Sequence, residues 1–147
     1  FLDIVESNLK TVHRICKLLG VQDVDFCHLR ALSSLSSLES DYDFIWCQGS
    51  LINVPFKIAY SEAQELLRHL KPTGRWIELA YPKTRWEREG KLPFDRWGER
   101  TDAGAPWIEW YDLEKLLARL QPSRFDVILH FEFHDSDFNW FDLLRRQ

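Results

Sequence analysis

Asp3 lies at the end of the short apolar segment 1–5, just before a helical pattern. In open α/β sheets, ligands bind beyond the carboxyl ends of the strands, so an acid at this position is placed to contact one. A carboxylate has two oxygens with spare lone pairs and can accept hydrogen bonds from two neighbouring hydroxyl groups of a ligand. The alternative is structural, because an acid near a helix N-terminus stabilises the helix dipole.

Two further strand ends carry polar or flexible residues. Gln48, Gly49 and Ser50 follow the apolar segment 42–47. Glycine allows close backbone approach to a ligand, and Gln or Ser can form hydrogen bonds with it, although a plain turn into a helix is the alternative. Arg30 and Ala31 follow the segment 24–29, where the flat guanidinium of Arg30 could lie over a flat ring of a ligand or remain solvated.

Large aromatic residues mark the segment 82–111, which has no clear periodicity and contains three prolines and four tryptophans. A loop this long is commonly functional, and Trp and Tyr provide large contact areas for a ligand. The candidate ligand-binding residues of this segment and its start are Tyr81, Trp86, Trp107 and Trp110. The alternative is that they pack the segment onto a sheet, and we expect most of them to pack and one or two to touch a ligand.

A possible metal pattern, His130, Glu132 and His134, occupies alternate positions of one segment. Histidines and carboxylates at such spacing can bind zinc, but the residues between them are apolar, as in a half-exposed edge strand. We therefore expect no metal. The three cysteines form no Cys-x-x-Cys motif and have no apparent basic partner, which argues against zinc, a disulfide framework and a nucleophilic role.

The elements that position these residues alternate between strands and helices. Ser7 or Asn8 is the expected cap of the first helix, and Gly20 its end. Pro72 should stop the helix before it, and Gly74 is free to take a positive φ. The expected strands are 1–5, 24–29, 42–47, 75–81, 125–134 and 139–144, the helices are 9–19, 61–70 and 112–120, and 31–40 is a loop or short helix.

This order predicts an α/β fold, a Rossmann-like, doubly wound, mostly parallel sheet between two helical layers, with an antiparallel C-terminal hairpin strand. The segments 3–6, 29–31 and 48–53, and the chain from Tyr81 onward, should then meet around one crevice.

Composition narrows the functional class. The 147 residues are 45% hydrophobic and 29% charged, which fits one globular domain. The formal charge of −4 gives no basic field for nucleic acid, and no apolar run is long enough to span a membrane. Unpaired cysteines suit a reducing cytoplasm. The sequence begins inside an apolar run without Met, so we expect an upstream part and read 1–147 as a single, N-terminally incomplete domain.

Taken together, these pieces resemble the class I S-adenosylmethionine-dependent methyltransferases, from the family's second strand onward. The resemblance rests on the segments Leu2–Ile4 with Asn8–Leu9, Asp43–Leu51, Leu66–Trp76 and the closing hairpin. It implies that Asp3, Ile4, Arg30, Ala31, Gln48 and Gly49 bind S-adenosylmethionine, with S-adenosylhomocysteine as the product.

The sequence departs from the family pattern at three places. The family's first strand and glycine-rich loop are absent, which predicts a gap or a new pairing in the sheet and weak cofactor binding at most. Arg30 and Ala31 stand where the family often has an acid, and Ile52 and Asn53 stand where many relatives have histidines.

The resulting hypothesis is methyl transfer to a small-molecule or sugar-like acceptor by in-line displacement, in which the protein supplies alignment. Asn53, Tyr81 and Glu78 are candidates to orient or deprotonate the acceptor. Beyond the acceptor, the expected partners are a second copy or an upstream domain. Two alternatives remain open: a non-catalytic binding or scaffold module with a degenerate methyltransferase fold, and a nucleotide-dependent oxidoreductase.

Overall fold

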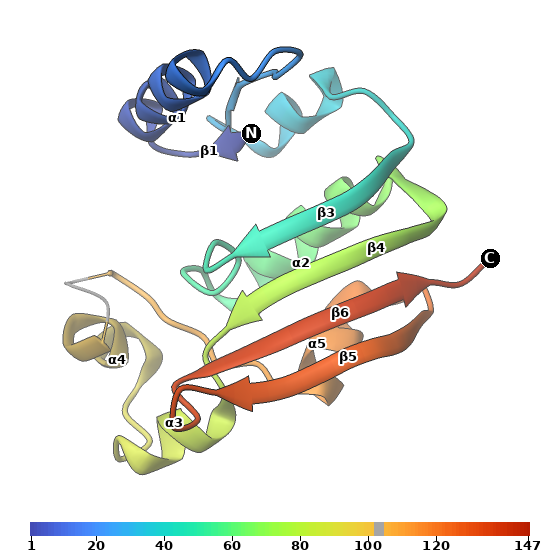
Figure 1. Cartoon of the computed structure of the whole chain (residues 1–147). Helices are drawn as coiled ribbons and strands as arrows, with labels where there is room; N and C mark the ends of the chain where they lie inside the picture. Colours follow the sequence, from blue (N-terminus) through green and yellow to red (C-terminus); the bar gives the residue numbers. More distant parts are fainter. Residues whose placement is uncertain (102–104) are drawn as a thin grey trace. The chain divides into compact units, whose positions relative to one another are not determined.

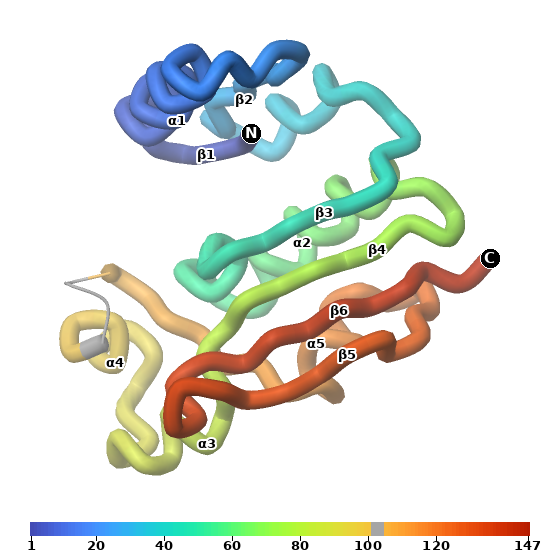
Figure 2. Tube along the Cα trace, viewed as in Figure 1, coloured from blue at the N-terminus to red at the C-terminus, as the bar shows by residue number. Residues whose placement is uncertain are grey.

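The computed structural model describes residues 1–101 and 105–147, and the chain divides into two compact units, 1–39 and 40–147. Figure 1 labels their elements, and the Cα trace in Figure 2 follows the same path. Each unit has its own hydrogen-bonded sheet. The strands of the described residues form two sheets, whereas the sequence pattern predicts one sheet with a gap or a new pairing.

The first unit is a β-α-β unit followed by a short 3-10 helix. β1 (Leu2–Asp3) pairs in parallel with β2 (Cys27–His28), and α1 (Glu6–Leu19) connects them; η1 (Leu32–Ser37) follows. Both strands are shorter than the sequence pattern predicts. Gly20 ends α1 with a φ of 68°, as expected.

The predicted cap of α1 is wrong, because the helix begins at Glu6 and contains both Ser7 and Asn8. The N-cap of α1 is Val5, and no side chain caps the helix there. Asp3 instead braces the start of the helix: the Val5 amide donates to Asp3 Oδ1 (2.7 Å), and Asn8 Nδ2 donates to Asp3 Oδ2 (3.0 Å). Periodicity alone could not show that the helix begins without a capping side chain.

The second unit is a four-stranded sheet in the order β3-β4-β6-β5 (Figure 1). β3 and β4 are parallel, and β6 runs antiparallel to both β4 and β5, which confirms the predicted C-terminal hairpin. Its elements are β3 (Tyr42–Gln48), α2 (Phe56–Leu67), β4 (Leu70–Ala80), α3 (Lys83–Arg88), α4 (Phe94–Thr101), α5 (Leu113–Leu120), β5 (Phe125–Phe133) and β6 (Phe138–Arg145).

Three boundaries in this unit differ from the prediction. α2 starts at Phe56 and ends at Leu67, and the expected turn 71–74 belongs to β4, where the pairing with β3 is irregular. Thr73, not Gly74, takes the positive φ (69°). Gly74 is needed for space, because a Cβ there would lie 2.6 Å from the side chain of Leu70. The segment 82–111 contains two helices, each too short for its periodicity to stand out.

The core of the second unit lies between the sheet and two helices. α2 and α5 pack against each other, and both lie behind the sheet in Figure 1. Because side chains alternate between the two faces of a strand, Trp76 and Phe141 point into this core. Phe44 and Trp46 lie on the opposite face, where they are 55% and 61% exposed. Within the unit, the carboxyl ends of β3 and β4 lie at the same edge of the sheet as the segment 82–111, because the two strands are parallel.

Candidate functional site

Asp3 lies at the carboxyl end of β1 and is partly exposed. Its two oxygens accept the hydrogen bonds from Val5 and Asn8, which fix the orientation of the carboxylate. Each carboxylate oxygen has a second lone pair, so the group can accept further donors from solvent or a ligand. The structural and ligand-binding roles proposed for this acid are therefore compatible.

The neighbouring candidates of the first unit are joined by one histidine. His28 Nε2 lies 3.1 Å from the carbonyl oxygen of Ile4, and Arg30 Nε donates to His28 Nδ1 (3.2 Å). Because a carbonyl only accepts, this arrangement assigns the proton to Nε2. The Ala31 amide donates to Ser34 Oγ at 3.3 Å. The structure thus brings Asp3, Ile4 and Arg30 together within this unit, and His28 is a link that strand alternation alone did not indicate.

The loop after β3 is held by Asn53. Its Nδ2 donates to the carbonyl of Gly49 (3.2 Å), and its Oδ1 is buried without a hydrogen-bond partner among the described residues. Gly49 has a φ of 64°, and nothing lies within 4 Å of the position that a Cβ would occupy. The backbone at Gly49 is therefore open to close approach, whereas Asn53 has a structural role in the loop. Gln48 is exposed.

The tryptophans predicted for the acceptor pocket form an aromatic cluster, consisting of Trp86, Phe94, Trp107 and Trp110. Ring centroids are 5.8 Å apart for Trp86 and Trp110, 5.8 Å for Trp86 and Phe94, and 5.6 Å for Phe94 and Trp107. The Trp86 indole donates to the carbonyl of Leu92, while the indole nitrogens of Trp107 and Trp110 are buried without partners among the described residues. Packing accounts for Trp86, and two unused donors remain in the cluster.

Tyr81 lies beside this cluster at the end of β4. It forms an isolated bridge with Trp110, and its ring contacts Trp97 and Phe138, each at 5.8 Å between centroids. Arg85 lies 4.4 Å from the centroid of the Tyr81 ring. The residue is 8% exposed, so it is held rigidly at the position where the sequence predicts contact with an acceptor.

Sequence reasoning did not predict the contacts of the partly buried ammonium group of Lys115. Lys115 Nζ lies 3.8 Å from the Trp110 ring centroid and forms an ion pair with the buried Glu109. Burial raises the pKa of the Glu109 carboxyl above its usual value, although the hydrogen bond from Lys115 opposes this shift. The Glu109 amide donates to the carbonyl of Ile52 (2.7 Å), so the end of the segment 82–111 is fastened to the loop after β3.

Glu78 is not an acceptor base, contrary to the sequence-based hypothesis. Its side chain is fully buried, forms an ion pair with the fully buried Arg119, and accepts a hydrogen bond from the Trp76 indole (2.8 Å). Alternation along β4 places it on the core face, away from solvent. Burial raises the pKa of the Cys47 thiol far above its usual value, which disfavours a thiolate nucleophile.

The histidines of the hairpin are engaged separately. His130 stacks on Phe141 with 4.8 Å between ring centroids, Glu132 accepts a hydrogen bond from Thr84, and His134 stacks on Phe138. Among the described residues, no group of three or more His, Cys, Asp or Glu side chains could hold a metal ion. In the same part of the chain, no helix is both long and apolar enough to cross a membrane.

Two surface depressions lie elsewhere on the two units. One of about 310 Å³ is lined by the end of α1 and the segment 20–26, and the other, of about 510 Å³, lies beside α5, the start of β5 and the end of β6. Neither of these two depressions includes a residue that the sequence predicts for cofactor or acceptor binding.

No protein-family model matches this sequence, and no curated protein sequence matches it either. Solved structures do resemble the chain. The N-methyltransferase NodS from Bradyrhizobium japonicum, in complex with S-adenosylhomocysteine, matches with a TM-score of 0.63 at 12% identity over 99% of this chain and 64% of NodS. Magnesium protoporphyrin IX methyltransferase (ChlM) from Synechocystis, with bound S-adenosylmethionine, gives 0.66 at 14% identity over 99% of this chain and 58% of ChlM.

The chain has the fold of the class I methyltransferases. A S-adenosylmethionine-dependent methyltransferase from Methanosarcina mazei adds a TM-score of 0.65 at 18% identity, over 99% of this chain and 80% of that one. The order of strands and the antiparallel hairpin, on which the resemblance in sequence rests, are therefore confirmed. This chain spans 64% of the length of NodS, and identities this low establish the methyltransferase fold rather than a reaction.

Proposed function

We propose that this chain takes part in S-adenosylmethionine-dependent methyl transfer to a small-molecule or sugar-like acceptor. The observation that carries the proposal is the oriented carboxylate of Asp3 at the carboxyl end of β1, in a chain with the methyltransferase fold. The solved methyltransferases NodS and ChlM hold S-adenosylhomocysteine or S-adenosylmethionine.

The residues present suit such a cofactor. In the first unit, Asp3 keeps lone pairs for two hydroxyl donors. In the second unit, taken by itself, the open backbone at Gly49 allows close approach of a ligand. We assign the ribose hydroxyls to Asp3, further cofactor contacts to Ile4, Arg30 and Ala31, and others to Gln48 and Gly49. When bound, S-adenosylmethionine supplies a methyl group on a positively charged sulfur that is already a good leaving group.

The acceptor is assigned to the segment that follows β4. Tyr81 and the aromatic cluster offer flat apolar surface together with the unused indole donors of Trp107 and Trp110, a combination that binds ring-shaped polar molecules. Tyr81 and Asn53 are proposed to orient the acceptor. The net charge of −4 argues against nucleic acid as the acceptor, and the three free cysteines support a cytoplasmic location.

A non-catalytic binding module is the second candidate. It is favoured by the hydrogen bonds of Asp3 with Val5 and Asn8 and by the bracing role of Asn53, because each explains its residue without a ligand. A methyltransferase would convert an acceptor to a methylated product, whereas a binding module would not.

The test is transfer of a labelled methyl group from S-adenosylmethionine to a panel of small phenols, amines and sugars. Methyl transfer requires label in an acceptor and an equal amount of S-adenosylhomocysteine. A protein that binds S-adenosylhomocysteine but labels no acceptor in a broad panel would support the binding module. Failure to bind S-adenosylhomocysteine even at millimolar concentration would reject the cofactor assignment under both candidate functions.

A further inference from the structure

The turn that connects β5 and β6 has an unusual backbone. His134, Asp135 and Ser136 have φ values of 56°, 55° and 59°, so three consecutive non-glycine residues lie in the left-handed region. Residues with a side chain rarely adopt this conformation without support from their surroundings. The Asp137 amide donates to the carbonyl of His134 (3.0 Å), which closes the turn. Such a turn needs contacts from elsewhere in the protein.

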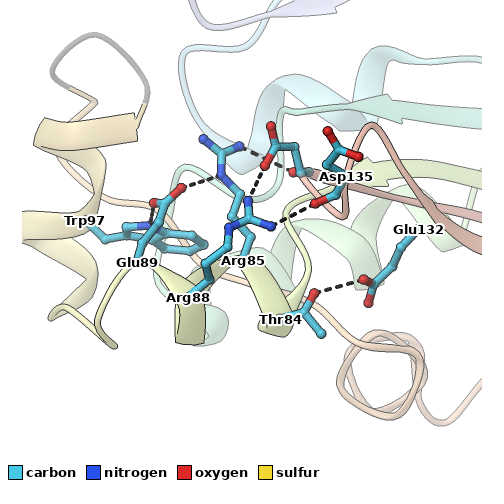
Figure 3. A network of polar contacts seen from close by, with 8 residues as sticks. Thr84, Arg85, Arg88, Glu89, Trp97, Glu132 and Asp135 are labelled. Carbon is cyan, nitrogen blue, oxygen red and sulfur yellow. Dashed lines mark hydrogen bonds and ion pairs between the residues drawn. The ribbon is translucent and has the colours of Figure 1, made fainter.

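Those contacts come from α3, which lies about fifty residues earlier in the chain. Arg88 Nη1 donates to the carbonyl of Asp135 (2.8 Å), and Arg88 also pairs with the carboxylate of Asp137. Arg85 Nη1 donates to the carbonyl of Asp137 at 3.3 Å. Figure 3 shows both guanidinium groups directed at the turn, with Thr84 bonded to Glu132 beside them. We call the four residues Arg85, Arg88, Asp135 and Asp137 the latch.

Two sets of contacts hold α3: the latch, and the packing of its Trp86 in the aromatic cluster. The helix has six residues, too few to be stable in isolation, and none of them is fully buried. It starts two residues after Tyr81, which directly follows β4. The hairpin turn therefore helps to fix the path of the chain immediately after Tyr81.

Arg85 connects the latch to the rest of the segment 82–111. Its Nε donates to Glu89 Oε1 (2.9 Å), and Glu89 Oε2 accepts from the indole of the fully buried Trp97 in α4 (2.6 Å). The same guanidinium lies over the rings of Tyr81 (4.4 Å) and Phe138 (6.0 Å). Its side chain is 13% exposed, whereas that of Arg88 is 49% exposed.

We propose that Arg85 is a positioning residue for the acceptor side of the site, which it fixes by holding Tyr81 and α4 to the hairpin turn. The proposal rests on the assignment of the acceptor to the segment after β4. Arg88 fastens the outer end of the latch, and Arg85 transmits that position inward to Tyr81 and Trp97. Removal of Arg85 should loosen the residues 83–101 as a group, while β3 and the first unit keep their protection.

The test compares Arg85→Met, Arg85→Lys and Arg88→Met with Arg96→Met. Arg96 is an exposed arginine of α4 that takes no part in the latch, so its variant is the matched control. Hydrogen exchange of the backbone amides in 83–101 and the NMR signal of the Trp97 indole proton, assigned with Trp97→Phe, are the two measurements. The indole signal reports the hydrogen bond to Glu89 directly and does not follow general stability.

We expect Arg85→Met to raise exchange in 83–101 by about tenfold and to shift the Trp97 indole signal. Arg85→Lys should restore part of the protection, because a lysine can pair with Glu89 but cannot also reach Asp137 with a second, fixed donor. Arg88→Met should act on 83–89 only, and Arg96→Met on neither. S-adenosylhomocysteine titrated into each variant should bind as in the wild type.

Unchanged exchange and an unchanged indole signal in Arg85→Met would overturn the proposal, as would equal effects of Arg96→Met. Both measurements are made without an acceptor. Failure of the wild type to bind S-adenosylhomocysteine would reject the proposed function. The effect of Arg85 on the order of residues 83–101 would remain valid.

Discussion

The buried ion pair between Glu78 in β4 and Arg119 in α5 offers a demanding test of how the second unit is held together. Both side chains are fully buried, and Arg119 also lies 4.4 Å from the centroid of the Tyr111 ring. Although burial disfavours its charge, Glu78 and Tyr111 raise the pKa of Arg119, so it stays a cation. The perturbations are Glu78→Gln, Arg119→Met and the two together. Glu78→Gln retains an oxygen for the Trp76 indole while removing the charge.

Either single variant leaves one charge buried without its partner, which costs about 3–5 kcal/mol of folding free energy. For a chain of 147 residues this corresponds to a fall of roughly 6–20 °C in Tm. The double variant buries no charge, so it should lose less than the sum of the single losses by about 2–3 kcal/mol. Glu78 Oε1 and Arg119 Nε have no partner among the described residues, which makes the wild-type pair itself costly to keep.

The assay is urea unfolding followed by circular dichroism, with thermal melting as a second measure. Asp126→Asn is the control, because the pair between Asp126 and Arg146 is about half exposed and should change stability by less than about 1 kcal/mol. Single variants that lose no more than this control, or a double variant that loses the full sum, would refute the assignment of a buried, mutually dependent pair.

Three further predictions concern single positions. Trp107→Ala or Trp110→Ala should impair turnover of the acceptor more than it weakens S-adenosylhomocysteine binding, measured by titration. If the variants melt far below the wild type and their folded fraction turns over normally, these tryptophans are core residues instead. Burial raises the pKa of the Glu62 carboxyl above its usual value, so its ionisation costs folding stability as the pH rises through the folded-state pKa. In urea unfolding, Glu62→Gln should therefore stabilise the protein near pH 7 but not near pH 4. Equal effects at both pH values would contradict this. Gly98→Ala would place a Cβ 2.2 Å from the carbonyl oxygen of Ala105, and should cost about 1–3 kcal/mol in the same assay; a neutral result would show that the backbone yields there.

The order of strands and helices could be predicted from the sequence because alternation and helical spacing are local signals. Strands such as Tyr42–Gln48 and the hairpin of β5 and β6 follow from alternation alone. The parallel pairing of β1 with β2 and of β3 with β4 then follows from the alternation of strands and helices, which few topologies satisfy. The pairing of β4 with β6 was not predicted. The start of α1 was missed because the helix begins at Glu6 with no capping side chain to mark it.

The site was less predictable because its contacts join residues far apart in sequence. Placement at strand ends indicated Asp3 and Gly49, and composition indicated the aromatic cluster. Neither could indicate that Glu78 pairs with Arg119 forty-one residues away, or that Arg88 reaches the turn after β5. These contacts depend on which strands pair and on which side chains a helix presents, and only the folded chain specifies both.

Weak binding of S-adenosylhomocysteine, followed by NMR, tests the central claim most directly. We predict progressive shifts of the amides of Ile4, Arg30 and Gly49 at millimolar ligand. Asp3→Ala should weaken binding by about ten- to a hundredfold. Asp3→Asn retains an oxygen to accept from the Val5 amide, so it should separate the loss of charge from the loss of that hydrogen bond. Unchanged affinity in Asp3→Ala, or shifts confined to the depression at the end of α1, would contradict the account.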